Sequence, residues 1–120
     1  MDDSLASDLR RECGDALRAI GTYDGDGYHV HYLREDVESG LDAADLDDIR
    51  QGAVLDTLHR DYYERLFSTA GTFEATVRLF ERALILEVPT GAGAGVMVSL
   101  DRDHDGSARA IVERCRDALG

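Results

Sequence analysis

The stretch TFEATVRLFERALILEVPTGAGAGVMVSL, residues 72–100, decides the fold because much of it alternates apolar with polar side chains. A period of two places successive side chains on opposite faces of a β-strand. We therefore predict three strands here, over residues 73–80, 83–88 and 96–100. The first strand carries charged residues on one face, whereas the other two are more apolar throughout. This difference predicts the first strand near an edge of a sheet and the others at its centre.

The connections between these strands differ in their chemistry. Glu81 and Arg82 form a short polar break, which predicts that the first two strands pair as a hairpin. Pro89 lacks a backbone N–H, so we expect the second strand to end there. Residues 90–95, TGAGAG, are small and are predicted to form a loop. Without a lysine or a following helix, this segment does not match a phosphate-binding loop.

Helical periodicity occurs in three segments outside this stretch, residues 3–20, 43–68 and 107–119. In the first segment, Gly14 weakens the helix and suggests close packing against the sheet. In the second, Gly52 is the expected point of a bend or split. The apolar stripe expected to pack in the second part of that helix consists of Leu55, Leu58, Tyr62 and Leu66.

Residues 21–34 are predicted to form a β-hairpin. Its turn is the segment 24–27, Asp-Gly-Asp-Gly, because Asp-Gly pairs are strong turn signals. Strict alternation after the turn predicts two faces, one with Tyr28, Val30 and Tyr32 and the other with His29, His31 and Leu33. Residues 35–42 are predicted to be a polar connector.

Together these elements predict an α+β fold in one domain, residues 1–120. The order is helix, two strands, helix, three strands, helix, with a five-stranded antiparallel sheet covered by helices. The first and last helices have narrow apolar stripes, so we expect them side by side on one face of the sheet. The middle helix then covers all or part of the other face.

The charge is strongly acidic. The chain has 25 acidic and 13 basic residues, a net charge of −12, and every basic residue is arginine. Such a surface repels itself in dilute buffer, but in molar salt the screening length falls to roughly 3 Å. We interpret this composition as that of a cytosolic protein from an extreme halophile; the alternative is an acidic mesophilic protein from a GC-rich genome.

The same composition bears on partners and location. A basic patch that could neutralise phosphates is missing from the sequence, which counts against nucleic acid as a partner. The sequence has no stretch approaching the roughly 18 apolar residues of a membrane span. Its N-terminus is acidic and polar, unlike a secretory signal. We therefore expect a cytoplasmic protein that binds neither nucleic acid nor a membrane.

The element order resembles that of the roadblock/longin/profilin-like group of small αββαβββα domains. This resemblance implies that the strand at residues 73–80 and the middle helix form a pairing surface. Three sequence segments also look like an uncharacterised family of short haloarchaeal proteins. They are LRRECGDALRAIGTYDGDGYHVHYLRED (9–36), TVRLFERALILEVP (76–89), and VMVSLDRD (96–103) with the closing RCRDALG. That family offers no catalytic residues.

The sharpest candidate site is the segment 101–106, Asp-Arg-Asp-His-Asp-Gly. Asp101, Asp103 and Asp105 alternate before a glycine, as in the opening of a calcium-binding loop. However, Val112 stands at the twelfth position, where such a loop needs glutamate, and the segment follows a strand. We interpret it as a strand-to-helix connection in which Asp105 or Ser107 caps the helix, and we predict no metal ligand here.

The histidines and cysteines offer weaker candidates. His29 and His31 have a usable metal-ligand spacing but lack a visible third ligand. The Asp-Gly turn at 24–27 lacks further ligands too. Cys13 and Cys115 match no metal-binding spacing and lie on apolar helix faces, which favours two reduced core thiols. A disulfide or a redox switch is the alternative.

Tyr62 and Tyr63 lie beside Arg60 and Arg65, and tyrosine and arginine are common at interface hot spots. The alternative is that one tyrosine is in the core and the other is half exposed. The four histidines form no nucleophile arrangement with serine or cysteine, and we predict no catalytic residue and no cofactor.

Three functions remain. The first is a non-catalytic binding or regulatory module that self-associates as a homodimer or binds a protein partner. The second is a small-molecule or ion sensor, with a pocket between sheet and middle helix or at the Asp101 loop. The third, an enzyme, would require a cleft with paired titratable groups.

Overall fold

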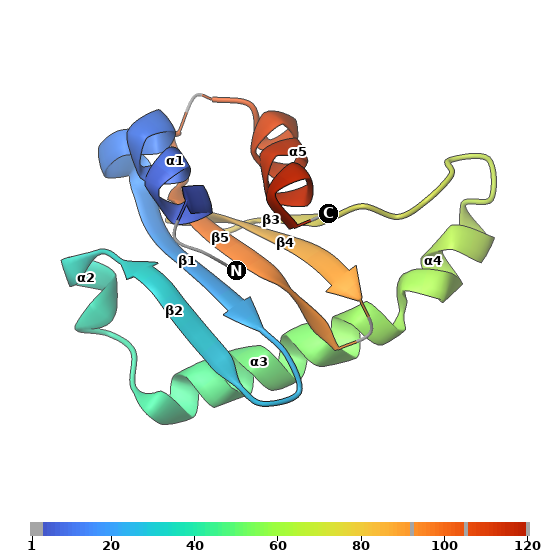
Figure 1. The fold of residues 1–120 in the computed structure, drawn as a ribbon, viewed down its shortest axis with the longest axis horizontal. Coiled ribbons are helices and arrows are strands. Elements are labelled where there is room, and N and C mark those ends of the chain that lie inside the picture. The colour runs from blue at the N-terminus through green and yellow to red at the C-terminus, as the bar shows by residue number, and fades with distance from the viewer. Residues whose placement is uncertain (1–3, 92, 105, 120) are drawn as a thin grey trace.

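The computed structural model describes residues 4–91, 93–104 and 106–119 (Figure 1). The elements are α1 (Ser4–Cys13), the 3-10 helix η1 (Gly14–Ala16), β1 (Leu17–Tyr23), β2 (Tyr28–Leu33), α2 (Glu35–Glu38), α3 (Ala43–Leu58), α4 (Arg60–Leu66), β3 (Thr76–Leu79), β4 (Ala83–Gly91), β5 (Ala94–Asp101) and α5 (Ala108–Leu119). The five strands form one antiparallel sheet in the order β2-β1-β5-β4-β3. The predicted α+β class and five-stranded antiparallel sheet are therefore confirmed, as is the place of β3 at an edge.

One face of the sheet is covered by α1 and α5, which lie side by side (Figure 1). Their apolar stripes meet the alternating residues of the central strands, as predicted. The buried cluster includes Leu5, Leu9, Leu86, Val88, Val96, Val98, Leu100, Ile111, Val112 and Cys115. Arg114 of α5 reaches Glu12 of α1 at 2.9 Å, which ties the two helices together at the surface.

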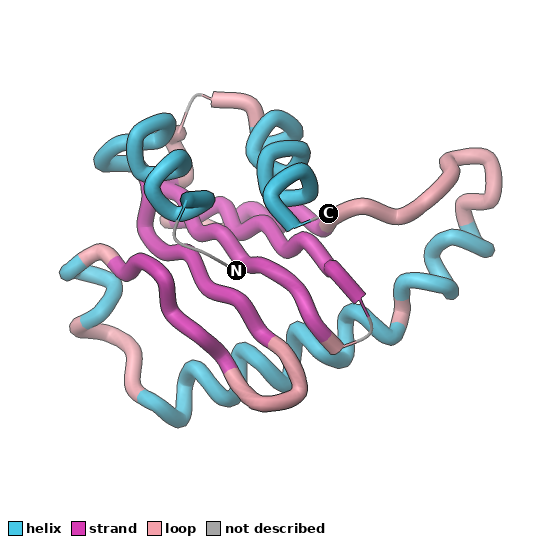
Figure 2. The backbone as a smooth tube through the Cα atoms, viewed as in Figure 1, coloured by secondary structure: helices cyan, strands magenta, loops and turns pink. Residues whose placement is uncertain are grey.

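The other face is crossed by α3 (Figure 2). Asp42 and Asp45 form a capping box at its start, in which each side chain accepts the other's backbone N–H. Ala53 and Thr57 are the buried residues of this helix. The Thr57 hydroxyl accepts the Gly93 N–H at 2.9 Å and donates to the Val54 carbonyl at 2.7 Å. These bonds fix α3 against the β4–β5 end of the sheet.

The first predicted helix was too long. Gly14 has a φ of +58°, which ends α1 and which other residues rarely adopt, and Leu17–Ile20 belong to β1. A Cβ at Gly14 would meet nothing within 4 Å, so the expected close packing there was wrong. Leu17 and Ile20 are buried in the strand, and the predicted helix would also have buried them. Their apolar spacing alone therefore could not distinguish a helix from a strand.

The strand ends also differ from the prediction. β4 continues past Pro89 to Gly91, and β5 begins at Ala94, so the predicted loop over residues 90–95 was wrong. Position 92 lies outside the described residues. The pairing shifts register between Pro89 and Gly91, and a proline is tolerated at such an irregularity.

β3 is shorter than predicted. The backbone N–H of Phe73 donates to the Glu64 carboxylate of α4 at 2.8 Å, and its ring stacks on Tyr63 at 5.8 Å between centroids. These contacts draw residues 73–75 toward α4 and away from the strand ladder. Pairing with β4 therefore begins only at Thr76.

The middle helical region breaks at His59 and not at Gly52, which stays inside α3. His59 adopts φ −89° and ψ −1°, and its N–H donates to the carbonyls of Asp56 and Thr57. Residues 35–38 of the predicted connector form the short helix α2. Among the described residues, no helix is both long enough and apolar enough to cross a membrane.

Candidate functional site

Exposed large apolar side chains concentrate in one part of the chain. Of the ten such residues in the described structure, nine lie between residues 55 and 80. They are Leu55, Leu58, Tyr62, Tyr63, Leu66, Phe67, Val77, Leu79 and Phe80. We call residues 55–80, which span the end of α3, α4 and β3, the exposed apolar region.

The helical part of this region presents its apolar stripe to solvent. Leu55 and Leu58 are 59% and 62% exposed, whereas Ala53 and Thr57 are buried. The prediction that the stripe from Leu55 to Leu66 packs was therefore wrong. The small residues Ala53 and Thr57 face the sheet and allow α3 to lie close to it. The larger Leu55 and Leu58 lie on the opposite side of the helix and face solvent.

The strand part of the region is an unpaired edge. Among the described residues, β3 pairs with β4 only, and the Phe80 N–H donates to the Ala83 carbonyl at 2.7 Å. Because backbone groups alternate in direction along a strand, Arg78 also points its N–H toward β4, whereas Val77 and Leu79 point theirs outward. Val77 and Leu79 are also exposed in their side chains.

The exposed apolar region and the two residues after it are close to neutral. Residues 55–82 contain five acidic and four basic residues, in a chain whose net charge is −12. The acidic excess therefore lies almost wholly outside this segment. Two copies of the chain therefore repel each other least where residues 55–82 of both come together.

A buried polar cluster holds this region to the sheet. Glu87 of β4 is 2% exposed, and its carboxylate accepts hydrogen bonds from the Tyr23 hydroxyl at 3.0 Å and from Arg78 at 3.2 Å. Arg78 also donates to Asp56 of α3 at 2.7 Å. Burial raises the pKa of Glu87, and burial next to this carboxylate raises the pKa of Tyr23. The cluster joins four elements: β1, β4, the edge strand β3 and α3.

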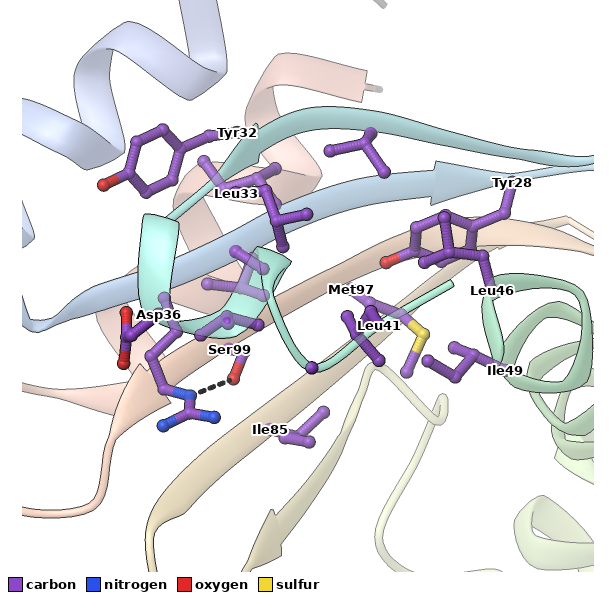
Figure 3. A pocket seen from close by; sticks show the side chains of 17 residues that line it. Tyr28, Tyr32, Leu33, Asp36, Leu41, Leu46, Ile49, Ile85, Met97 and Ser99 are labelled. Carbon is purple, nitrogen blue, oxygen red and sulfur yellow. Dashed lines mark hydrogen bonds between the residues drawn. The ribbon is translucent and has the colours of Figure 1, made fainter. Parts of the chain in front are cut away.

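A separate cavity of about 340 Å³ lies between the sheet and the α2–α3 segment (Figure 3). Its walls are mostly apolar and include Val30, Leu33, Val37, Leu41, Leu46, Ile49, Ile85 and Met97. Val30 lines the cavity and remains 42% exposed, which shows that the cavity opens to solvent beside β2.

Tyr28 forms part of the cavity wall. Its ring lies across Gly21, where a Cβ would come within 2.2 Å of the Tyr28 hydroxyl, so only glycine leaves room for it. In Figure 3 the hydroxyl is turned toward Met97 and Leu41. Burial raises the pKa of Tyr28 to about 12. Within the described residues, this hydroxyl has no hydrogen-bond partner.

The polar end of the cavity is formed by Arg18 and Ser99. Arg18 donates from Nε to the Ser99 hydroxyl at 3.2 Å, the dashed bond in Figure 3. Arg34 holds Asp101 in a bidentate pair, with both N···O distances 2.9 Å, and also binds Asp36. The hydrogen bonds from Arg34 are the main cause that lowers the pKa of Asp101.

These contacts explain why Asp101 does not take part in the cation-binding loop that was considered for residues 101–106. Asp101 turns back to Arg34 and does not face the loop, because the arginine satisfies both of its oxygens. Asp105 lies outside the described residues. The Ser107 hydroxyl accepts the Ala110 N–H at 3.1 Å, so Ser107 caps α5 as predicted. In the described ranges, no group of three or more His, Cys, Asp or Glu residues could hold a metal ion.

The histidine pair is separated by an irregularity. The β1–β2 register passes from Ile20↔Tyr32 to Gly21↔Val30, so His31 is the extra residue of a bulge. His31 bonds to Thr22 at 2.9 Å, whereas exposed His29 lies 3.4 Å from Asp24.

The bulge also corrects the predicted faces of β2. Tyr32 lies on the α1 side, where the Arg10 guanidinium sits 4.7 Å above its ring, while Tyr28 lines the cavity on the α3 side. The 24–27 turn is confirmed: Asp24 donates its N–H to the Gly27 carbonyl and accepts two backbone N–H groups with its side chain.

Cys13 and Cys115 are both buried free thiols in the core between α1, α5 and the sheet. Burial is the main cause that raises the pKa of each thiol, to about 11 for Cys115. Tyr62 and Tyr63 are both exposed, at 52% and 40%, so neither is a core residue.

The predictions from the sequence did not indicate that Glu87 belongs to a buried polar cluster or that Arg18 and Tyr28 line a cavity. A glutamate inside the apolar run ALILEV was a usable signal, because a carboxylate at a buried strand position requires partners. For Arg18 and Tyr28 the sequence held no comparable signal, since their positions depend on the start of β1 and on the bulge.

Comparisons with known proteins agree with this architecture. The family model described as Domain of unknown function (DUF7522) matches residues 3–120. No curated protein matches the chain. Among solved structures, one similar to the chain is the crystal structure of a Roadblock/LC7 domain from Streptomyces avermitilis, at 19% sequence identity and a TM-score of 0.61. The similarity covers 98% of this chain and 91% of that one, and at this identity it shows the fold alone. The resemblance of the element order to roadblock domains is thereby confirmed.

Proposed function

The chain belongs to the DUF7522 family, a domain of unknown function, and we propose that it is a non-catalytic binding module that pairs with a second copy of itself. The observation that carries this proposal is the set of nine exposed large apolar side chains between residues 55 and 80. A monomeric soluble protein rarely exposes large contiguous apolar patches, so such a set indicates an interaction surface. The runner-up partner is a different protein with the same kind of surface.

The edge strand supplies the geometry for pairing. The outward N–H and C=O groups of β3 are free to bond to a strand from another molecule. Two copies related by a two-fold axis can set β3 against β3 in antiparallel fashion, which continues the sheet across the axis. In that arrangement Val77 and Leu79 meet the same residues of the second copy.

The helical part of the exposed apolar region adds the burial. Complete burial of a large apolar side chain contributes roughly 1.5–3 kcal/mol, so the six half-exposed ones of the helical part contribute roughly 5–9 kcal/mol per copy. A two-fold pair counts this contribution twice. The loss of translational and rotational freedom costs roughly 4–15 kcal/mol, so the burial is large enough to support a stable pair.

The acidic composition supports a setting for this pairing. We propose that residues 1–120 fold as one domain in the cytosol of a salt-adapted, haloarchaeal organism. Concentrated salt screens the repulsion between two copies, each of charge −12, and strengthens apolar burial. The near-neutral charge of residues 55–82 supports contact at that surface.

The placement of the titratable groups supports a role without catalysis. Several side chains with clearly shifted pKa values, Glu87 with Tyr23 and Asp101 with Arg34, are hydrogen-bonded to each other. Groups bonded in this way stabilise the contacts between strands and helices and have few lone pairs or protons left for a substrate.

Sedimentation velocity in multimolar KCl tests the proposal. We expect a dimer, of twice 13.2 kDa, for the native sequence. Val77→Pro removes an outward N–H while leaving the inward bonds to β4, and we expect it to yield monomer. Leu58→Glu should weaken the dimer by about tenfold or more, since it places a charge in the helical contact.

The matched control is Val30→Glu, which puts the same charge on an exposed valine at the opposite edge of the sheet. We expect this variant to remain dimeric. A native chain that sediments as a monomer at high concentration, or a Val77→Pro variant that dimerises as well as the native chain, would count against the proposal.

A further inference from the structure

The cavity under α2 and α3 has the features of a ligand site that self-association does not use. It is lined by residues of β1, β2, β5 and the α2–α3 segment, with Ile85 from β4, and none of them belongs to the exposed apolar region. Its volume of about 340 Å³ lies within the range of small-molecule sites, roughly 300–1,000 Å³. Such sites combine apolar walls with a few polar groups, as this one does.

The first polar group is the Arg18 guanidinium. A guanidinium has five N–H donors, and among the described residues Arg18 makes one hydrogen bond, from Nε to Ser99. Its contact with Asp101 is 3.8 Å long, because Arg34 already binds both oxygens of that carboxylate. Arg18 therefore lines the cavity and still has N–H groups that can donate to a ligand.

The second polar group is the Tyr28 hydroxyl. It lies within a largely apolar wall, is turned into the cavity, and has no partner within the described part of the chain (Figure 3). Gly21 leaves the space for its ring. Arg18 and Tyr28 thus both offer hydrogen-bond donors, and the ligand that fits them carries acceptor oxygens.

The charges around Arg18 decide whether that ligand is charged. Arg18 and Arg34 face Asp36 and Asp101, so the two positive and two negative charges balance. The chain as a whole carries −12. A carboxylate entering this end of the cavity would find no net positive charge, whereas an uncharged carbonyl would still accept the N–H groups of Arg18.

We infer that this cavity binds an uncharged amphipathic molecule, with a carbonyl head at Arg18 and an apolar body that lies against Ile85 and Met97. A cavity of 150 Å³ holds benzene, so this one holds on the order of a dozen non-hydrogen atoms. Lactones, esters and ketones with a medium-length alkyl chain have this size and chemistry. The occupant enters beside β2, where Val30 is exposed.

The test uses γ-decalactone as the probe and decanoate as its charged counterpart, both titrated into the full chain in multimolar KCl. The readout is the methyl signal of Met97, since the sequence has only two methionines and Met97 lines the cavity. We expect the lactone to shift this signal and to bind at least tenfold more tightly than decanoate. Equal or tighter binding of decanoate would overturn the choice of an uncharged head.

Variants test the polar end. Arg18→Met should weaken lactone binding by about tenfold to a hundredfold, as expected for a hydrogen bond from a charged donor. Arg109→Gln, an exposed arginine of α5, is the control and should leave it unchanged. A native chain whose Met97 signal does not respond, or an Arg18→Met variant that binds as tightly as the native chain, would overturn the inference. If Arg18→Met does not fold, Arg18→Gln takes its place, with a loss of about threefold to tenfold expected.

Discussion

The two sides of the sheet use the same kind of apolar stripe with opposite results. On one side, the stripes of α1 and α5 are buried against β4 and β5, and they form the core. On the other, the stripe that runs from Leu55 through α4 is left in solvent, next to the edge strand β3, which has a neighbouring strand on one side only among the described residues. The chain thus completes one side by itself, and we infer that the other side is completed by a second molecule.

The largest expected effect contrasts a leucine from each side. Leu9 is 0% exposed, and Leu9→Ala should lower the free energy of unfolding by about 2–5 kcal/mol because it leaves a cavity. Leu58→Ala, at a 62% exposed site, should change the unfolding of the monomer by less than about 0.5 kcal/mol. Chemical denaturation at low protein concentration measures both. Equal losses would mean that the contrast between the two sides is not real.

The next effect concerns the cluster that attaches the open side to the sheet. Arg78→Met leaves Glu87 buried without its cation and should cost roughly 1–3 kcal/mol at neutral pH. Arg78 lowers the pKa of Glu87, so its loss raises that pKa further in the folded state. A folded-state pKa above the unfolded value gives stability that is present at low pH and lost as the pH rises through it.

The destabilisation of Arg78→Met should therefore shrink as the pH falls below 7, because the variant's Glu87, whose pKa is raised further, takes up a proton. Thermal unfolding at several pH values checks this, with Arg109→Met as a control for the loss of an exposed arginine. A loss of stability that stays constant over this range would show that Glu87 does not depend on Arg78.

The smallest expected changes in stability come from two glycines, Gly14 in η1 and Gly52 in α3. Gly14 has a φ of +58°, so Gly14→Ala should cost about 1–2 kcal/mol. Gly52 lies inside α3, and a Cβ there would meet nothing within 4 Å, so Gly52→Ala should stabilise the protein by up to about 1 kcal/mol. Changes in Tm of the same sign for both variants would contradict this account.

Much of the fold could be predicted because the deciding patterns are local. The alternation of residues 83–88 and 96–100 and the stripe of α5 identify the central strands and the last helix with their buried faces. The predictions failed where distant contacts decide. Glu64 and Tyr63 shorten β3 by holding Phe73, and the bulge at His31 changes the face on which Tyr32 lies.

The candidate surface was only half predictable. The edge position of β3 followed from its charged residues. The periodicity of Leu55, Leu58 and Tyr62 showed a one-sided helix but could not show which side meets the sheet. That choice depends on Ala53 and Thr57, whose small size and contact with Gly93 bring α3 onto the sheet. The cavity depends on both helix placement and the bulge, so the sequence alone gave no lining residues.

Amide hydrogen exchange in β3, resolved by residue, tests the pairing most directly. The N–H groups of Arg78 and Phe80 point to β4 and should be protected at any protein concentration. If β3 pairs with β3 of a second copy, the outward N–H groups of Val77 and Leu79 become equally protected at concentrations where the chain is a dimer, and lose this protection on dilution. Rapid exchange of Val77 and Leu79 in the dimer would contradict this pairing.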